Sequence, residues 1–209
     1  MKNGEFERMS ENKGDEEMAG HESVFKGINI GKYTDEHQKL SSDLRKYVKG
    51  DITFLCVGTD RSTGDSFAPF VGTFLKEKGY ENVIGTIDDP VHAENLDERI
   101  QEIPEGSTVL AIDGCLGRLK SVGSLTLNSG SLYPGVGVGK NLTPVGDYHI
   151  NGVVNVSSED RMLNFRILGC TKLSLVLKLA KQCVAAIEDA FPIHNEKFES
   201  APLFFKEIK

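Results

Sequence analysis

The feature that most constrains the fold is the short apolar run at residues 52–57, Ile-Thr-Phe-Leu-Cys-Val. A run that is apolar on both faces and has β-branched content is typical of a buried strand in a parallel sheet. A loop of small and polar residues follows it, and Pro69 is then expected to open a helix that ends at Gly79. Strand, loop and helix in this order predict the first unit of an α/β domain.

The same alternation continues along the chain. We expect further strands at residues 82–87, 108–112, 124–127 and 152–156, and helices at residues 35–50, 93–103 and 159–190, the last with a break at Gly169. Alternating strands and helices favour a mostly parallel, mixed sheet of about five strands that is covered by helices on both faces. The sequence therefore predicts an α/β fold with three layers, α/β/α.

The domain organisation follows from composition. We expect one domain at residues 23–195, between a polar tail at residues 1–22 and a C-terminal tail at residues 196–209. No apolar run approaches the roughly 20 residues that span a bilayer, and the first residues lack the apolar segment of a secretory signal. The expected location is therefore the cytoplasm, with no membrane partner. The formal net charge of −7 argues against a nucleic-acid partner, because binding phosphates needs a basic face.

Two acidic residues are expected at one edge of the sheet. Asp65 lies in the loop after the strand at residues 52–57, and Asp113 directly follows the strand at residues 108–112. Ligands of open α/β sheets bind outside the carboxyl ends of the strands, so both carboxylates would face one crevice if these strands are neighbours. Such a pair can share a proton and activate water, or it can bind a metal ion.

Each acid alone also has a structural explanation. Asp65 could cap the helix that follows its loop, and the sequence Asp113-Gly114 is a common turn signal. The functional interpretation depends on the two acids occurring together, each beside an apolar strand.

Two glycine-rich segments lie near the expected site. The first, at residues 58–64, is not followed by the Lys-Ser/Thr of a Walker A loop, and its acids would repel phosphate. The second, at residues 128–140, follows the strand at residues 124–127 and is expected on the same edge as the acids, where a glycine-lined wall would let a peptide backbone approach closely. The expected substrate-binding residues are Thr59, Asp60, Arg61 and Gly64 in the first segment and Gly135, Gly137 and Gly139 in the second.

No cofactor is expected. His92 lies beside Asp88 and Asp89 and could join a metal site, and His149 is expected at the start of a strand. The five histidines show no H-x-x-x-H spacing, however, and ordinary surface or packing positions are the favoured interpretation. A divalent metal ion held by Asp65 and Asp113 is the alternative to an acid pair.

The segment at residues 56–73, with Gly58-Thr59-Asp60-Arg61-Ser62-Thr63-Gly64-Asp65 at its centre, resembles the signature of the YyaC-type spore proteins. The helix at residues 171–176 is similar to that family as well, and the likeness extends over about residues 46–186. More distantly, the layout is similar to the spore germination protease and to the hydrogenase maturation endopeptidases, which implies a mixed three-layer fold of the phosphorylase/hydrolase type. By motif position, Asp65 and Asp113 match the two acids of those sites, and residues 131–139 resemble the Pro-Gly-x-Gly-Val-Gly loop of the germination protease.

This resemblance implies a sporulation-associated peptidase of an atypical aspartic type, located in the forespore or spore core. Its implied partner is a protein or peptide substrate, with small acid-soluble spore proteins as the first candidates. The alternatives are a non-catalytic sporulation factor that keeps the fold to bind a partner, and a metal-dependent endopeptidase of the maturation type. The hydrogenase-processing relatives add a histidine to their metal site, and no histidine of this sequence can be assigned to that position, which favours an acid pair over a metal.

Overall fold

The computed structural model describes residues 30–136, 139 and 142–193. The chain divides into two units, residues 1–34 and 35–209. The described part of the first unit, residues 30–34, is the start of a helix, and the rest of the description concerns the second unit. The tails expected at residues 1–22 and 196–209 lie outside the described residues.

The described chain alternates helices and strands as expected. The strands form one sheet in the order β2-β1-β3-β5-β4, in which β4 is antiparallel to β5 and the other neighbours are parallel. This is the mostly parallel, mixed five-stranded sheet that the sequence predicts. The elements are α1 (Ile30–Tyr47), β1 (Ile52–Val57), α2 (Phe67–Glu77), β2 (Val83–Ile84), α3 (Leu96–Arg99), β3 (Thr108–Gly117), β4 (Leu125–Ser129), β5 (Tyr148–Val156), α4 (Arg161–Gly169) and α5 (Leu173–Ala190), with short 3₁₀ helices at Ile100–Glu102 and Leu119–Ser121.

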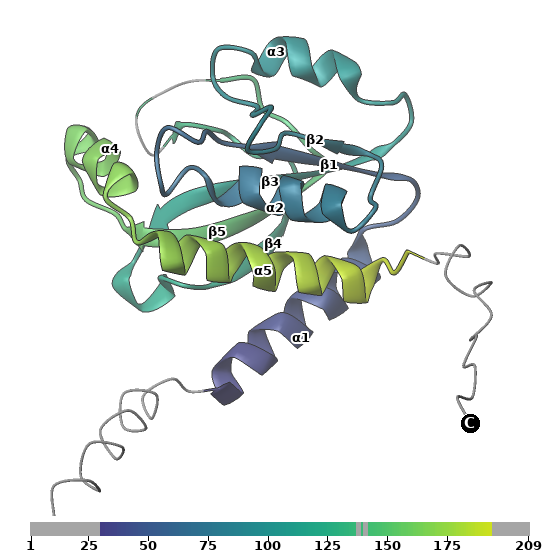
Figure 1. The fold of residues 1–209 in the computed structure, drawn as a ribbon, viewed down its shortest axis with the longest axis horizontal. Coiled ribbons are helices and arrows are strands. Elements are labelled where there is room, and N and C mark those ends of the chain that lie inside the picture. Colours follow the sequence, from purple (N-terminus) through teal and green to yellow (C-terminus); the bar gives the residue numbers. More distant parts are fainter. Residues whose placement is uncertain (1–29, 137–138, 140–141, 194–209) are drawn as a thin grey trace, which may run out of the picture. The chain divides into compact units, whose positions relative to one another are not determined.

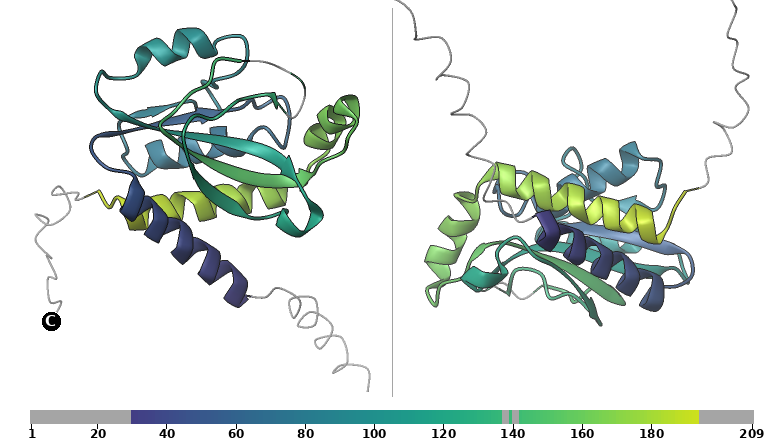
Figure 2. Two further views of the ribbon diagram at one scale, coloured as in Figure 1. Left: turned by 180° about the vertical axis from the view of Figure 1, so that it is seen from behind. Right: turned by 90° about the horizontal axis from the view of Figure 1, so that it is seen from below.

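Helices cover both faces of the sheet. Because side chains alternate along a strand, Phe54 and Cys56 of β1 join the apolar cluster formed with α2 and α5, whereas Leu55 and Val57 join a second cluster with Leu96 of α3. Figures 1 and 2 show α2 and α5 side by side on one face and α3 on the other. The three-layer α/β/α fold is thereby confirmed. None of the helices in the described part of the chain is long and apolar enough to cross a membrane.

One strand is longer than the sequence predicts. The expected strand at residues 108–112 continues as β3 to Gly117, because β5 pairs with it beyond the end of β1, past a bulge between Cys115 and Leu116. The expectation that Asp113 follows the strand is therefore wrong, since Asp113 lies inside β3. It nevertheless pairs in register with Val57, the last residue of β1, and so it stands at the carboxyl edge of that neighbour.

The glycine-rich segment after β4 also departs from expectation. Because β4 runs antiparallel, its last residue, Ser129, pairs with Tyr148 at the start of β5, at the sheet edge away from the acids. The expectation that this segment begins on the same edge as the acids is therefore wrong. The chain instead returns across the face that carries α3, where Leu132 and Val145 bridge to one another and join the cluster of Leu96. This return brings Pro134 and Gly135 back to the acids.

Candidate active site

The loop after β1 folds back onto the end of its own strand. The amide of Gly58 donates to the carbonyl of Val91 at 2.7 Å, and the amide of Thr59 donates to the carbonyl of Asp65 at 3.2 Å. A Cβ on Gly58 would lie only 2.1 Å from that Asp65 carbonyl oxygen, so the loop closes in this way only around glycine. The closure places Asp65 above the end of β1.

A second glycine contact joins this loop to β3. A Cβ on Gly114 would lie 2.7 Å from the carbonyl oxygen of Gly64, which means that the two backbones touch at these residues. Gly64 also donates its amide to the carbonyl of Leu168 in α4 at 2.9 Å. Asp65 follows Gly64 and Asp113 precedes Gly114, so the backbone contact brings the two acids to one place.

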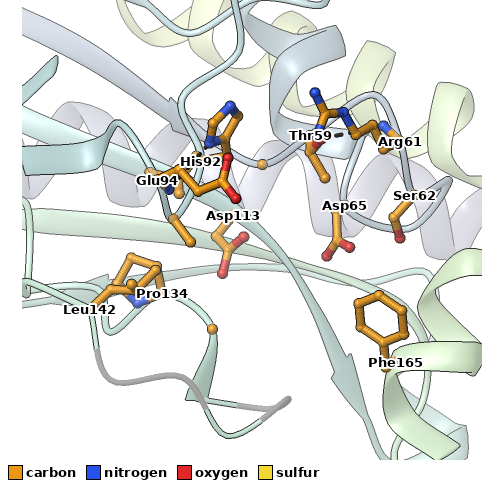
Figure 3. A pocket seen from close by; sticks show the side chains of 14 residues that line it. Thr59, Arg61, Ser62, Asp65, His92, Glu94, Asp113, Pro134, Leu142 and Phe165 are labelled. Atoms are coloured by element: carbon orange, nitrogen blue, oxygen red, sulfur yellow. Dashed lines mark hydrogen bonds between the residues drawn. The ribbon is translucent and has the colours of Figure 1, made fainter. Parts of the chain in front are cut away.

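Both carboxyl groups point into the same cavity (Figure 3). Each acid is partly buried. Burial and, second, the negative charge of Asp65 raise the pKa of Asp113 to about 8, against the opposing effect of a hydrogen bond from the backbone of Gly114. Asp113 therefore keeps its proton at neutral pH while Asp65 faces it, which is the charge state expected of two close carboxylates.

Two cavities meet at the acids. One has a volume of about 310 Å³ and the other about 490 Å³, and both are lined by Asp65, Asp113 and Gly135. The first cavity, shown in Figure 3, has His92 and Glu94 toward Asp113 and Phe165 of α4 toward Asp65. The second cavity continues on the other side, along β3 and β5. The pair thus stands where the two cavities meet.

The expected substrate-binding residues are only partly brought together. Thr59 and Arg61 line the first cavity, and Gly135 lines both. Asp60 is exposed, where its carboxylate accepts a hydrogen bond from the Thr59 hydroxyl at 3.4 Å, and it lines neither cavity. Gly64 is buried and holds the loop rather than facing a cavity.

The two remaining glycines of the second segment have different positions. Gly139 adopts φ +79° and lies against the Arg161 side chain. Gly137 lies outside the described residues.

Several cavity residues did not stand out in the sequence. Glu94 and Phe165 line the first cavity, together with His92, and Asn151 lines the second with His149. The two histidines were expected at ordinary positions, but both face the cavities that contain the acids. For Asn151 the missing signal was the true length of β5, because residues 148–151 belong to that strand.

A metal ion held by the two acids is the alternative to a shared proton. Within residues 30–136, 139 and 142–193, no three His, Cys, Asp or Glu side chains are grouped so that they could hold one. Asp65 and Asp113 could supply two carboxylate ligands, and a metal-dependent reaction remains a hypothesis to be tested with a chelator.

The fold and the paired acids define a three-layer α/β protein with a two-sided cleft at the carboxyl edge of its central strands. The family described as "Protein of unknown function (DUF1256)" matches residues 30–186, and the chain belongs to this family. It is 48% identical over 146 residues to "Uncharacterized protein YyaC" of Bacillus subtilis (strain 168), a match that covers 68% of this chain and 70% of that protein. The resemblance to YyaC-type proteins is therefore confirmed. No solved structure matches the chain.

Proposed function

We propose that this protein is a peptidase of an atypical aspartic type that acts in sporulation, with Asp65 and Asp113 as its catalytic pair. The observation that carries the proposal is the difference in protonation between the two acids. Asp113 holds a proton at neutral pH because it is buried and lies near the charge of Asp65, and both groups face one cavity. An acid and a base are then available together, as peptide hydrolysis requires.

The reaction follows from these charge states. Asp65 takes a proton from a water molecule as the water oxygen forms a bond to the scissile carbonyl carbon. Asp113 then donates its proton to the peptide nitrogen as the carbon–nitrogen bond breaks. The two products are a carboxylic acid and an amine, and the resting state returns when the proton that Asp65 took from water moves to Asp113.

The two cavities support a polypeptide substrate. A chain cleaved in its interior must extend on both sides of the reacting bond, and the acids lie between cavities of about 310 and 490 Å³. The substrates that the family resemblance suggests are small acid-soluble spore proteins, in the forespore or spore core.

A second candidate function is the binding of a partner without cleavage. It is favoured by exposed apolar side chains beside the cavities, because Tyr133 is 64% exposed and Phe165 is 59% exposed. Large exposed apolar groups at a cleft are typical of sites that bind other proteins. In that case the protein would capture a stable partner and cleave nothing.

The test compares the wild-type protein with the variants Asp65→Asn and Asp113→Asn. Each is incubated with purified small acid-soluble spore proteins and with a spore lysate, and new peptide ends are identified by mass spectrometry. Asp60→Asn is the matched control, because it removes a carboxylate from the same loop that lines neither cavity. The proposal expects cleavage by the wild type and the control and none by the other two. Cleavage that persists in Asp65→Asn and Asp113→Asn would refute the mechanism.

A further inference from the structure

The register of the sheet places two polar side chains beside Asp113. In the parallel pairing of β3 with β5, Asp113 lies opposite Asn151 and Ala111 lies opposite His149. Residues two apart along a strand point to the same face, so Asp113, Asn151 and His149 share a face of the sheet. All three line the cavity of about 490 Å³.

The imidazole ring of His149 is held in one orientation. Its Nδ1 lies 2.8 Å from the carbonyl oxygen of Gly130. A carbonyl oxygen can only accept a hydrogen bond, so Nδ1 carries the proton that it donates, and Nε2 of the neutral ring is left with a free lone pair. Nε2 is therefore available as a hydrogen-bond acceptor for a molecule in the cavity.

The amide of Asn151 is available as well. It makes no side-chain hydrogen bond to any other residue in the described ranges 30–136, 139 and 142–193. The side chain is partly exposed, and its amide offers both a donor and an acceptor. Next to Asp113 the cavity thus presents a donor from Asn151 and, two residues back along β5, an acceptor from His149.

We propose that His149 and Asn151 form a binding subsite for the main chain of an extended polypeptide, on the β5 side of the acid pair. Every peptide group apart from those before proline carries one acceptor and one donor. The Asn151 amide donates to a substrate carbonyl beside the acids, and Nε2 of His149 accepts from a substrate N–H. The two side chains leave the strand about 6.6 Å apart, which is the length of two residues in an extended chain. The choice of a polypeptide as the ligand rests on the proposed function, but binding at the subsite does not require cleavage.

The experiment uses N-acetylalanine N-methylamide, a small probe that carries two peptide groups around one residue. It is titrated into the ¹⁵N-labelled full chain, and the signals of the Asn151 side-chain amide and the His149 ring are followed by NMR. Both signals are expected to shift together and to saturate. The proposal would be overturned if other signals respond and saturate while these two do not shift. It would also be overturned if no signal responds to the probe.

Variants distinguish the subsite from a structural role. His149→Asn retains a donor near the position of Nδ1, where it can reach Gly130, but it removes the acceptor at Nε2. His149→Gln is the matched control, because its longer side chain keeps an acceptor near the position of Nε2. Loss of one neutral hydrogen bond weakens binding by about 3- to 10-fold, so His149→Asn and Asn151→Ala should raise the probe's dissociation constant by that factor while His149→Gln stays close to the wild type. Equal binding by all variants would contradict the proposal.

Failure of this inference can be separated from failure of the proposed function. If the wild type cleaves no polypeptide and the probe still binds through His149 and Asn151, the peptidase proposal fails and the subsite stands. If the wild type cleaves its substrate but neither side chain responds to the probe, the subsite is refuted and the acid pair stands. With a cleaved peptide, His149→Asn should raise KM more than it lowers kcat, which a change in the acid pair would not do.

Discussion

Replacing Asp113 by asparagine is expected to stabilise the folded protein at neutral pH. The native state holds the pKa of this carboxyl at about 8, whereas an unfolded aspartate titrates near 3.9. The folded protein therefore binds a proton that the unfolded chain releases between these two values. Where the native state binds more protons, the free energy of unfolding falls as pH rises.

The size of this effect follows from the distance between the two pKa values. The contribution of Asp113 to stability is fully present below about pH 4, is lost by roughly 1.4 kcal/mol per pH unit above that, and reaches a plateau above about pH 8. At pH 7 the loss is on the order of 4 kcal/mol. Asparagine has nearly the same shape and does not ionise, so Asp113→Asn avoids this loss of stability. For a domain of this size the gain corresponds to a rise in Tm of roughly 8–16 °C.

The assay is thermal and urea unfolding of the wild type and Asp113→Asn from pH 4.5 to pH 8.5. The difference in free energy of unfolding should be smallest at the acid end, about 1 kcal/mol at pH 4.5, should grow up to about pH 8, and should then level off. Asp60→Asn serves as the control, because this exposed residue lies in the same loop but lines neither cavity. A difference that stays flat for Asp113→Asn, or a variant that is less stable than the wild type at pH 7, would refute the reasoning.

Three other results are expected. Gly114→Ala should destabilise the protein by about 1–3 kcal/mol in urea unfolding and abolish cleavage, since its Cβ would lie 2.7 Å from the Gly64 carbonyl oxygen and would push the acid loop away; unchanged activity would contradict the backbone contact. Asp160→Ala should cost about 1 kcal/mol, because the carboxylate caps α4 by accepting hydrogen bonds from the amides of Met162 and Leu163; equal unfolding midpoints would contradict that role. Cleavage should be unaffected by EDTA, whereas its loss, with recovery when one divalent cation is restored, would favour the metal-dependent alternative.

The central strands and the break between the last two helices could be predicted from the sequence because their signals are local. The apolar run at residues 52–57 is β1 residue for residue, and the break expected at Gly169 falls between α4 and α5. Local patterns were enough because each segment is either apolar throughout or interrupted by a strong breaker.

The errors have a common physical cause. Asp113 and Gly114 have the composition of a turn, but pairing with β5 keeps them extended, so a contact between distant segments overrides the local preference. Likewise β5 begins at Tyr148, ahead of the expected strand at residues 152–156, because residues 148–151 pair with β3 and β4.

The acids of the candidate site could be predicted from the sequence, whereas the residues around them could not. The rule that ligands bind at the carboxyl ends of strands is enough to select Asp65 and Asp113, and both face one cavity. The positions of His149 and Asn151 depend on strand register, which a single sequence does not reveal. The route of the glycine-rich segment depends on the direction of β4, which alternation of elements alone does not predict.

The most direct measurement of the acid pair is a ¹³C NMR titration of the Asp113 side-chain carboxyl in the wild type and in Asp65→Asn. In the wild type the carboxyl is expected to titrate with a pKa of about 8. In Asp65→Asn the pKa should fall, because the neighbouring negative charge is gone, and it should remain above the usual range of an aspartate, because burial persists. A wild-type pKa near 4, or a value that Asp65→Asn leaves unchanged, would contradict the proton-sharing pair on which the proposed function depends.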